Sequence, residues 1–201
     1  MNDLNRALGD ISNIRQQLAS TTEFRGYGPA TLAATGAIAV LAAAIQSKWL
    51  PDPAPHIATY LVIWVAAAIL SAALIALEMF QRTQRIHSGM ADQMIRMAAT
   101  QFLPSAAAGA LLTLVLLRAA PTEIWMLPGL AQIVFSLGVF ASCRSLPRHM
   151  AIAGVWYLLT GLACIAVGDI RALSPWAMGI PFGAGQILVA AILQAAAKEP
   201  R

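Results

Sequence analysis

Two glutamines, Gln132 and Gln186, are the side chains best placed to do chemistry inside an otherwise apolar stretch of this sequence. An amide in apolar surroundings is costly unless its N–H and C=O groups find hydrogen-bond partners. The two amides can bond each other, bond backbone groups freed by Pro128 and Pro181, or bind a polar ligand. We therefore treat Gln132 and Gln186 as candidates for a ligand site or for interhelical polar contacts.

Glu78 is the one carboxylate that falls inside an apolar run. It stands four residues before Arg82, a spacing at which a helical ion pair forms readily. Carboxylates deep in a membrane can carry protons, but Glu78 falls near the end of its run. We expect it to pair with Arg82 or to extend toward water.

The three histidines do not form a site. His56, His87 and His149 fall in three separate polar segments, so no haem held between two helices is expected. The sequence also shows no paired carboxylates, nucleophile elbow, phosphate-binding loop or His-Glu-x-x-His motif. We expect a non-enzymatic protein that uses no cofactor and no metal.

The apolar run that contains Glu78 fixes the class of protein. Residues 57–77 are 21 residues without a single charge. As a helix they would extend about 31 Å, the thickness of the hydrocarbon core of a bilayer. The whole chain is 59% hydrophobic and 11% charged, whereas soluble domains carry about 25% charged residues. The apolar run and the low charge content together predict a polytopic membrane protein.

Five further apolar segments have comparable character, and polar connections separate them. The connections after the first, third, fourth and fifth segments are short and contain proline. We predict an all-α membrane protein of six transmembrane helices, arranged as three hairpins and preceded by an amphipathic helix. Pro104 is expected to permit a bend at the start of the third span. The spans are expected at residues 30–50, 57–80, 99–120, 124–143, 150–168 and 176–197, after a segment at 1–29 and before a charged tail at 198–201.

The segment at 1–29 has an apolar face that recurs at spacings of 4, 3, 3 and 4 residues, which is typical of a helix. Its polar face is neutral, whereas helices that bind an anionic membrane surface are usually rich in Lys and Arg. The face can pack on the chain's own bundle, lie in the membrane interface, or dock on a protein partner or a second copy. It consists of Leu4, Leu8, Ile11, Ile14 and Leu18.

The distribution of basic residues predicts the orientation. Ten of the 13 Lys and Arg residues fall in the N-terminal segment, the second and fourth connections and the tail. The other three, Lys48, Arg118 and Arg171, fall in the remaining connections. Because cytoplasmic connections are enriched in Lys and Arg, both termini are expected in the cytoplasm. The basic residues form no dense patch, so no nucleic-acid partner is expected.

Small residues at helical spacing indicate close helix packing. Ala68, Ala72 and Ala76 form one stripe, and Gly179 with Gly183 forms another. Either stripe can serve packing within the chain or a homodimer seam.

Four stretches of the sequence carry a resemblance: WAMGIPFGAGQILVAAIL (176–193), LPGLAQIVFSLGVFA (127–141), TGLACIAVGD (160–169) and ISNIRQQLASTTEF (11–24). Together they resemble a family of uncharacterised bacterial inner-membrane proteins with an amphipathic start and six spans, often encoded beside a winged-helix transcriptional regulator. The resemblance implies a multi-pass protein of the bacterial inner membrane. No catalytic or binding residues are established for that family, so it implies none here.

These observations lead to two functional hypotheses. The first is a membrane interaction or signalling protein that acts through its cytoplasmic helix on a protein partner. The alternative is a small permease, or a protein that binds a lipid or small molecule, using the bundle interior near Gln132 and Gln186.

Overall fold

The computed structural model describes residues 28–86, 91–143 and 149–198, with side chains described for 28–81, 100–143 and 149–196. The predicted N-terminal amphipathic helix, with its face at Leu4, Leu8, Ile11, Ile14 and Leu18, lies outside these residues.

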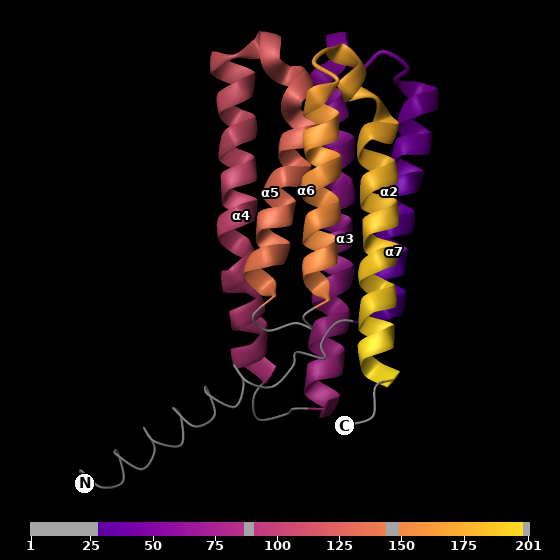
Figure 1. Ribbon diagram of the computed structural model, residues 1–201, viewed down its shortest axis with the longest axis vertical. Helices are drawn as coiled ribbons and strands as arrows, with labels where there is room; N and C mark the ends of the chain where they lie inside the picture. Colours follow the sequence, from indigo (N-terminus) through magenta and orange to yellow (C-terminus); the bar gives the residue numbers. More distant parts are fainter. Residues whose placement is uncertain (1–27, 87–90, 144–148, 199–201) are drawn as a thin grey trace, which may run out of the picture.

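Every element within the described ranges is helical, which confirms the all-α class. The long helices run side by side in one bundle (Figure 1). Three short 3-10 segments lie at the end where α2 meets α3, α4 meets α5 and α6 meets α7; we call this the connection end and the opposite one the terminal end. The elements are α2 (Pro29–Trp49), η1 (Ala54–His56), α3 (Ile57–Ile86), α4 (Ala91–Ala119), η2 (Pro121–Met126), α5 (Leu127–Ser142), α6 (Met150–Ala166), η3 (Ile170–Leu173) and α7 (Pro175–Lys198).

Five segments of the described residues are long and apolar enough to cross a membrane. They comprise α2, η1 with most of α3, the second part of α4, η2 with α5, and most of α7. The helix α6 is apolar but shorter. This composition is that of a multi-pass membrane protein.

Helices α3 and α4 are longer than a membrane span. The third span was expected at residues 99–120, and its apolar segment lies at Thr100–Ala119. The helix that contains it, α4, begins earlier, at Ala91, and continues through Pro104. A proline is tolerated inside a transmembrane helix because neighbouring helices and local adjustments satisfy the backbone group it frees. The 30 residues of α3 and 29 of α4 correspond to about 45 Å and about 43 Å of helix.

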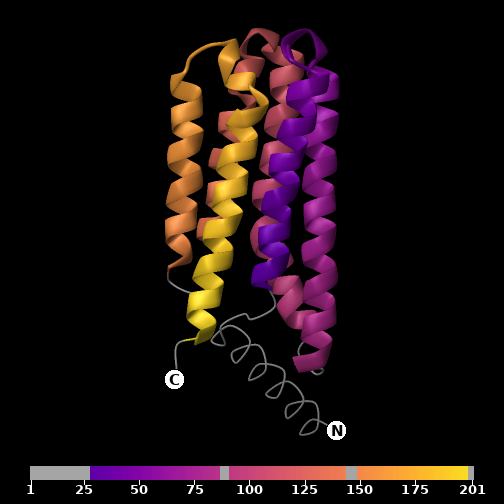
Figure 2. The same cartoon turned by 90° about the vertical axis from the view of Figure 1, so that its right-hand side faces the viewer.

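The six helices form an incomplete ring in the order α3, α2, α7, α6, α5, α4 (Figures 1 and 2). The most extensive contacts join α2 to α7 and α5 to α6, and α3 touches α4 only slightly. The chain therefore pairs its first described helix with its last.

Glycines explain how closely α2 and α7 approach. A Cβ atom added at Gly36 would lie 3.0 Å from the Gly183 carbonyl oxygen and 3.1 Å from Gln186 Cβ. A Cβ added at Gly179 would overlap Ala43. Gly179 and Gly183 therefore serve packing within the chain, one of the two roles expected of this pair.

The contact between α5 and α6 has the same basis. A Cβ at Gly129 would lie 2.7 Å from the Gly161 carbonyl oxygen, and a Cβ at Gly161 would lie 2.7 Å from that of Gly129. Only glycine permits the two backbones to approach in this way.

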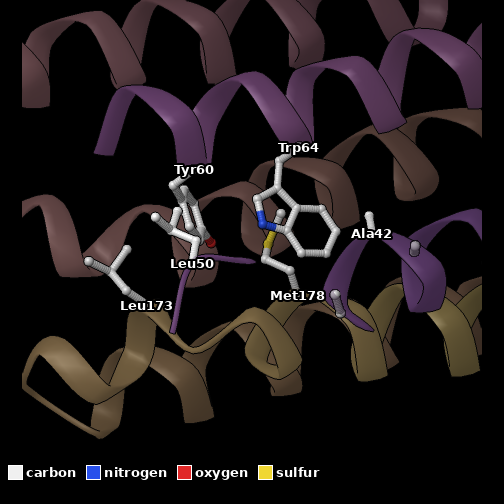
Figure 3. Packing of buried hydrophobic residues seen from close by; sticks show 8 residues of the cluster. Ala42, Leu50, Tyr60, Trp64, Leu173 and Met178 are labelled. Atoms are coloured by element: carbon white, nitrogen blue, oxygen red, sulfur yellow. The ribbon is translucent and has the colours of Figure 1, made fainter. Parts of the chain in front are cut away.

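Aromatic rings fill the interior of the ring of helices. Phe135 of α5 packs edge-on against Phe102, Tyr157 and Phe182, with ring centroids 5.2, 4.7 and 5.2 Å away. Nearer the connection end, Tyr60 and Trp64 of α3 join a buried cluster with residues of α2, η3 and α7 (Figure 3). That cluster comprises Ala39, Ala42, Ala43, Leu50, Tyr60, Trp64, Leu173 and Met178.

Large apolar side chains cover the outward faces, as expected for a surface in contact with lipid tails. Val62, Val65 and Ile69 of α3 are exposed, and so is the alanine stripe at Ala68, Ala72 and Ala76. This stripe therefore makes no close helix contact within the described chain.

Candidate functional site

Gln132 links α5 to α7. Its side chain is completely buried, and Nε2 donates to the Ala177 carbonyl oxygen at 2.9 Å and to the Pro128 carbonyl oxygen at 3.2 Å. Pro181 stands four residues after Ala177 inside α7 and has no N–H to bond that carbonyl. Gln132 therefore supplies the donor that the proline removes.

A second side chain bonds the backbone beside Pro181. The indole Nε1 of Trp156, on α6, donates to the Pro181 carbonyl oxygen at 3.0 Å. The region of α7 around the proline is thus held from both α5 and α6, and the bond from Gln132 has a structural role.

Gln186 lies deeper in the bundle and does not meet Gln132. Ala177, which Gln132 contacts, stands nine residues earlier in α7, about 13 Å along the helix axis. The Gln186 side chain lies beside the Tyr157 hydroxyl, but Gln186 Oε1 and the hydroxyl are both buried without meeting hydrogen-bond geometry with any described residue. These two candidate residues therefore belong to two separate levels of the bundle.

Gln46 is a buried amide that the sequence reasoning missed. It is completely buried in α2, and neither Nε2 nor Oε1 has a hydrogen-bond partner within the part of the chain that the structure describes. Gln46 stands near the end of its apolar run, where an exposed amide would be ordinary. Its place on the helical face of Ala42, Ala43 and Leu50 is the signal that could have revealed its burial.

Tyr60 and Trp64 also bury polar atoms. They stand at the membrane-interface end of the sequence run, yet their rings lie inside the bundle, 2% and 8% exposed. The Tyr60 hydroxyl and the Trp64 indole nitrogen are buried and unpartnered among the described residues. Figure 3 shows both groups pointing from α3 toward the side of Leu50 and Met178.

Glu78 caps the start of α2. Its Oε2 accepts a hydrogen bond from the Gly28 backbone N–H at 3.1 Å, and Gly28 is the N-cap of α2. A carboxylate at a helix N-terminus satisfies a free N–H and interacts favourably with the helix dipole. A Cβ at Gly28 would overlap this carboxylate. The side chain of Arg82, the expected partner, lies outside the described residues.

An exposed ion pair organises the η3 connection, which lies between the apolar helices α6 and α7. Asp169 Oδ1 accepts from the Arg171 backbone N–H at 2.9 Å, and Arg171 NH2 lies 2.8 Å from Asp169 Oδ2. Hydrogen bonds from Arg171 lower the pKa of the Asp169 carboxyl, and the carboxylate raises the pKa of Arg171. This pair stabilises a turn and faces solvent.

Metal-binding residues are not clustered in the part of the chain that the structure covers, where no three His, Cys, Asp or Glu side chains could hold one ion. His56 and His149 are exposed near opposite ends of the bundle, and His87 lies outside the described residues.

Comparison with protein-family models, with curated protein sequences and with solved structures finds no match. The buried amides and hydroxyls of the bundle are therefore the features from which a ligand site can be argued.

Proposed function

We propose that this chain is a six-span protein of the bacterial inner membrane, without catalytic activity, that acts by binding a protein partner in the cytoplasm. The partner would contact the terminal end of the bundle and the N-terminal helix with its face at Leu4, Leu8, Ile11, Ile14 and Leu18.

The observation that carries this proposal is the length of α3 and α4. Both exceed by more than about 10 Å the helix needed to cross a hydrocarbon core of about 30 Å. Their excess lies at the terminal end, where α3 extends beyond the ends of α5 and α6 (Figure 1). Two helices that continue past the membrane offer a rigid surface on which an amphipathic helix or a partner can pack.

The distribution of basic residues supports a cytoplasmic position for the terminal end of the bundle. Residues 82–86 of α3 and 91–96 of α4 include Arg82, Arg85 and Arg96, and the positive-inside rule places such segments in the cytoplasm. The neutral polar face of the N-terminal segment favours protein over an anionic lipid surface.

Cross-linking in native membranes, followed by mass spectrometry, tests the proposal. The full chain is compared with a variant lacking residues 1–24 and with a Leu4→Asp, Ile11→Asp, Leu18→Asp variant. We expect a cross-linked partner that only the full wild-type chain captures, at unchanged membrane insertion. Identical cross-link profiles, or loss of insertion in the triple variant, would instead make this segment part of the chain's own packing.

A second candidate function is a small permease or a protein that binds a small molecule in the bundle interior. The buried Gln186 Oε1, which meets hydrogen-bond geometry with no described residue, favours it. Gln186→Leu should then remove thermal stabilisation by a ligand found in a screen. Gln132→Leu serves as the comparison, because the bond from Gln132 to Ala177 makes its loss a change in stability with or without ligand.

A further inference from the structure

Four side chains near the connection end bury polar atoms that no described residue satisfies. They are Gln46 Nε2 and Oε1, the Tyr60 hydroxyl, Trp64 Nε1 and Gln132 Oε1. We call these four residues the connection-end polar cluster. A buried polar atom without a partner destabilises a folded chain, and such atoms in a native fold are usually bonded to ordered water or to another bound molecule.

The four residues come from α2, α3 and α5 and lie at the same end of the bundle. Tyr60 and Trp64 occupy adjacent turns of α3, with ring centroids 6.4 Å apart. Both pack in one cluster with Leu50, the residue that follows α2, and with Met178 of α7. Gln46 stands four residues before Leu50, and its backbone carbonyl oxygen accepts from the Leu50 N–H at 2.7 Å.

Gln132 reaches the same region from α5. Ala131, its neighbour in sequence, packs against that cluster. Gln132 Nε2 bonds the carbonyl of Ala177, the residue next to Met178. The amide of Gln132 therefore lies at the depth of Tyr60 and Trp64, near the first turns of α7.

The cluster carries no charged group and offers both hydrogen-bond donors and hydrogen-bond acceptors. It offers donors at Gln46 Nε2, Tyr60 and Trp64, and acceptors at Gln46 Oε1 and Gln132 Oε1. The nearby charged residues of the described chain face away: Lys48, Asp52, His56, Arg118 and Arg171 are exposed, Glu123 bonds Trp125, and Asp169 bonds Arg171.

We propose that the connection-end polar cluster binds a small, neutral molecule of the carboxamide or urea type. Such a molecule carries an N–H beside a C=O, so it can pair with the Gln46 amide through two hydrogen bonds. Its remaining donor and acceptor sites meet Gln132 Oε1 and the groups of Tyr60 and Trp64. This site is independent of the cytoplasmic partner proposed above, because it lies at the opposite end of the bundle.

Acrylamide tests the proposal directly, because it is a small neutral carboxamide that quenches tryptophan fluorescence on contact. The protein, in lipid nanodiscs, is titrated with acrylamide and separately with iodide, a charged quencher. The signal of Trp64 is the difference between wild type and Trp64→Phe. We expect saturable quenching of Trp64 by acrylamide and none by iodide.

Gln46→Leu and Tyr60→Phe then test the site, since both keep nearly the volume and remove the polar group. We expect acrylamide to bind about tenfold more weakly to Gln46→Leu, the effect of losing one to two hydrogen bonds. Tyr60→Phe should weaken binding less. Gln186→Leu, which changes an amide at a deeper level, should bind as wild type does.

Three results would overturn the proposal. Quenching that is equal in wild type and Gln46→Leu would show that no carboxamide binds at this amide. Equal quenching by iodide would show a site open to charged solutes. Saturable quenching in wild type that Gln186→Leu removes would place the ligand at the deeper level, as the permease hypothesis expects. The cross-linking experiment on the N-terminal segment tests the cytoplasmic partner alone, so its outcome is separate from these three quenching results.

Discussion

Gln132 Nε2 lies 2.9 Å from the carbonyl oxygen of Ala177, the acceptor that Pro181 leaves without a helical donor. A proline in α7 and a glutamine in α5 are thus two halves of one arrangement. The proline frees a carbonyl inside the membrane, and the amide from a neighbouring helix satisfies it.

This pairing predicts how the two positions depend on each other. Gln132→Leu should lower the free energy of unfolding by about 1–3 kcal/mol, because the Ala177 carbonyl becomes a buried acceptor without a donor. Pro181→Ala restores an N–H in α7. The double variant should therefore lose less stability than the sum of the two single variants. Unfolding measured in detergent or nanodiscs for all four proteins checks this; strict additivity would contradict it.

Glu78 and Gly28 lead to a second prediction. Glu78→Ala should destabilise the start of α2 by about 1 kcal/mol, the typical value of an N-terminal cap. Glu78→Gln keeps an oxygen acceptor and loses the charge, so its effect should be smaller. Hydrogen exchange of the α2 amides in both variants measures this. If the two substitutions have equal effects, the charge makes no contribution.

The glycine contact between α2 and α7 predicts a steric effect. Gly36→Val places a side chain against the backbone of Gly183, and backbone cannot give way as a flexible side chain can. We expect a loss of about 1–3 kcal/mol. Gly109→Ala is the matched control, since its Cβ would lie 3.5 Å from Val134, an ordinary contact. Thermal unfolding of both variants should show a lowered Tm only for Gly36→Val.

Asp169 predicts a local dependence on pH. Arg171 lowers the pKa of this carboxyl in the folded protein. A carboxyl whose pKa is lower in the folded protein stabilises the fold at pH values above its ordinary pKa of about 4. This contribution is lost as pH falls through the lowered pKa. An NMR titration of the Asp169 carboxyl should give a higher pKa in Arg171→Gln than in wild type. An unchanged titration would show that the ion pair does not persist in solution.

The all-α class and the apolar helices could be predicted because they depend on local composition. A run such as residues 57–77 has no charge, and only a helix satisfies its backbone in lipid. The continuation of α4 from Ala91 through Pro104 as one helix could not be predicted, because Pro104 is a bend signal whose effect depends on the neighbouring helices. The pairing of α2 with α7 depends on the arrangement of the bundle.

The candidate site, like the fold, could be predicted from the sequence only in part. Polar residues near the middle of an apolar run, Gln132 and Gln186, could be selected from sequence. The acceptor that Gln132 bonds could only be given as one of several alternatives. Gln46 was missed because its burial depends on contacts with distant helices, not on its distance from the end of the run. The bond between Glu78 and Gly28 joins residues 50 positions apart, beyond any local pattern.

The pairing of the first described helix with the last has a consequence for biogenesis. While the ribosome is still making the chain, α2 enters the membrane with its glycine face and its buried Gln46 amide uncovered, since α7 is not yet synthesised. Until synthesis ends, that face is available to an insertase or an intramembrane chaperone. A chain that terminates early would keep it uncovered, which gives quality-control proteases a simple feature by which to recognise an unfinished product.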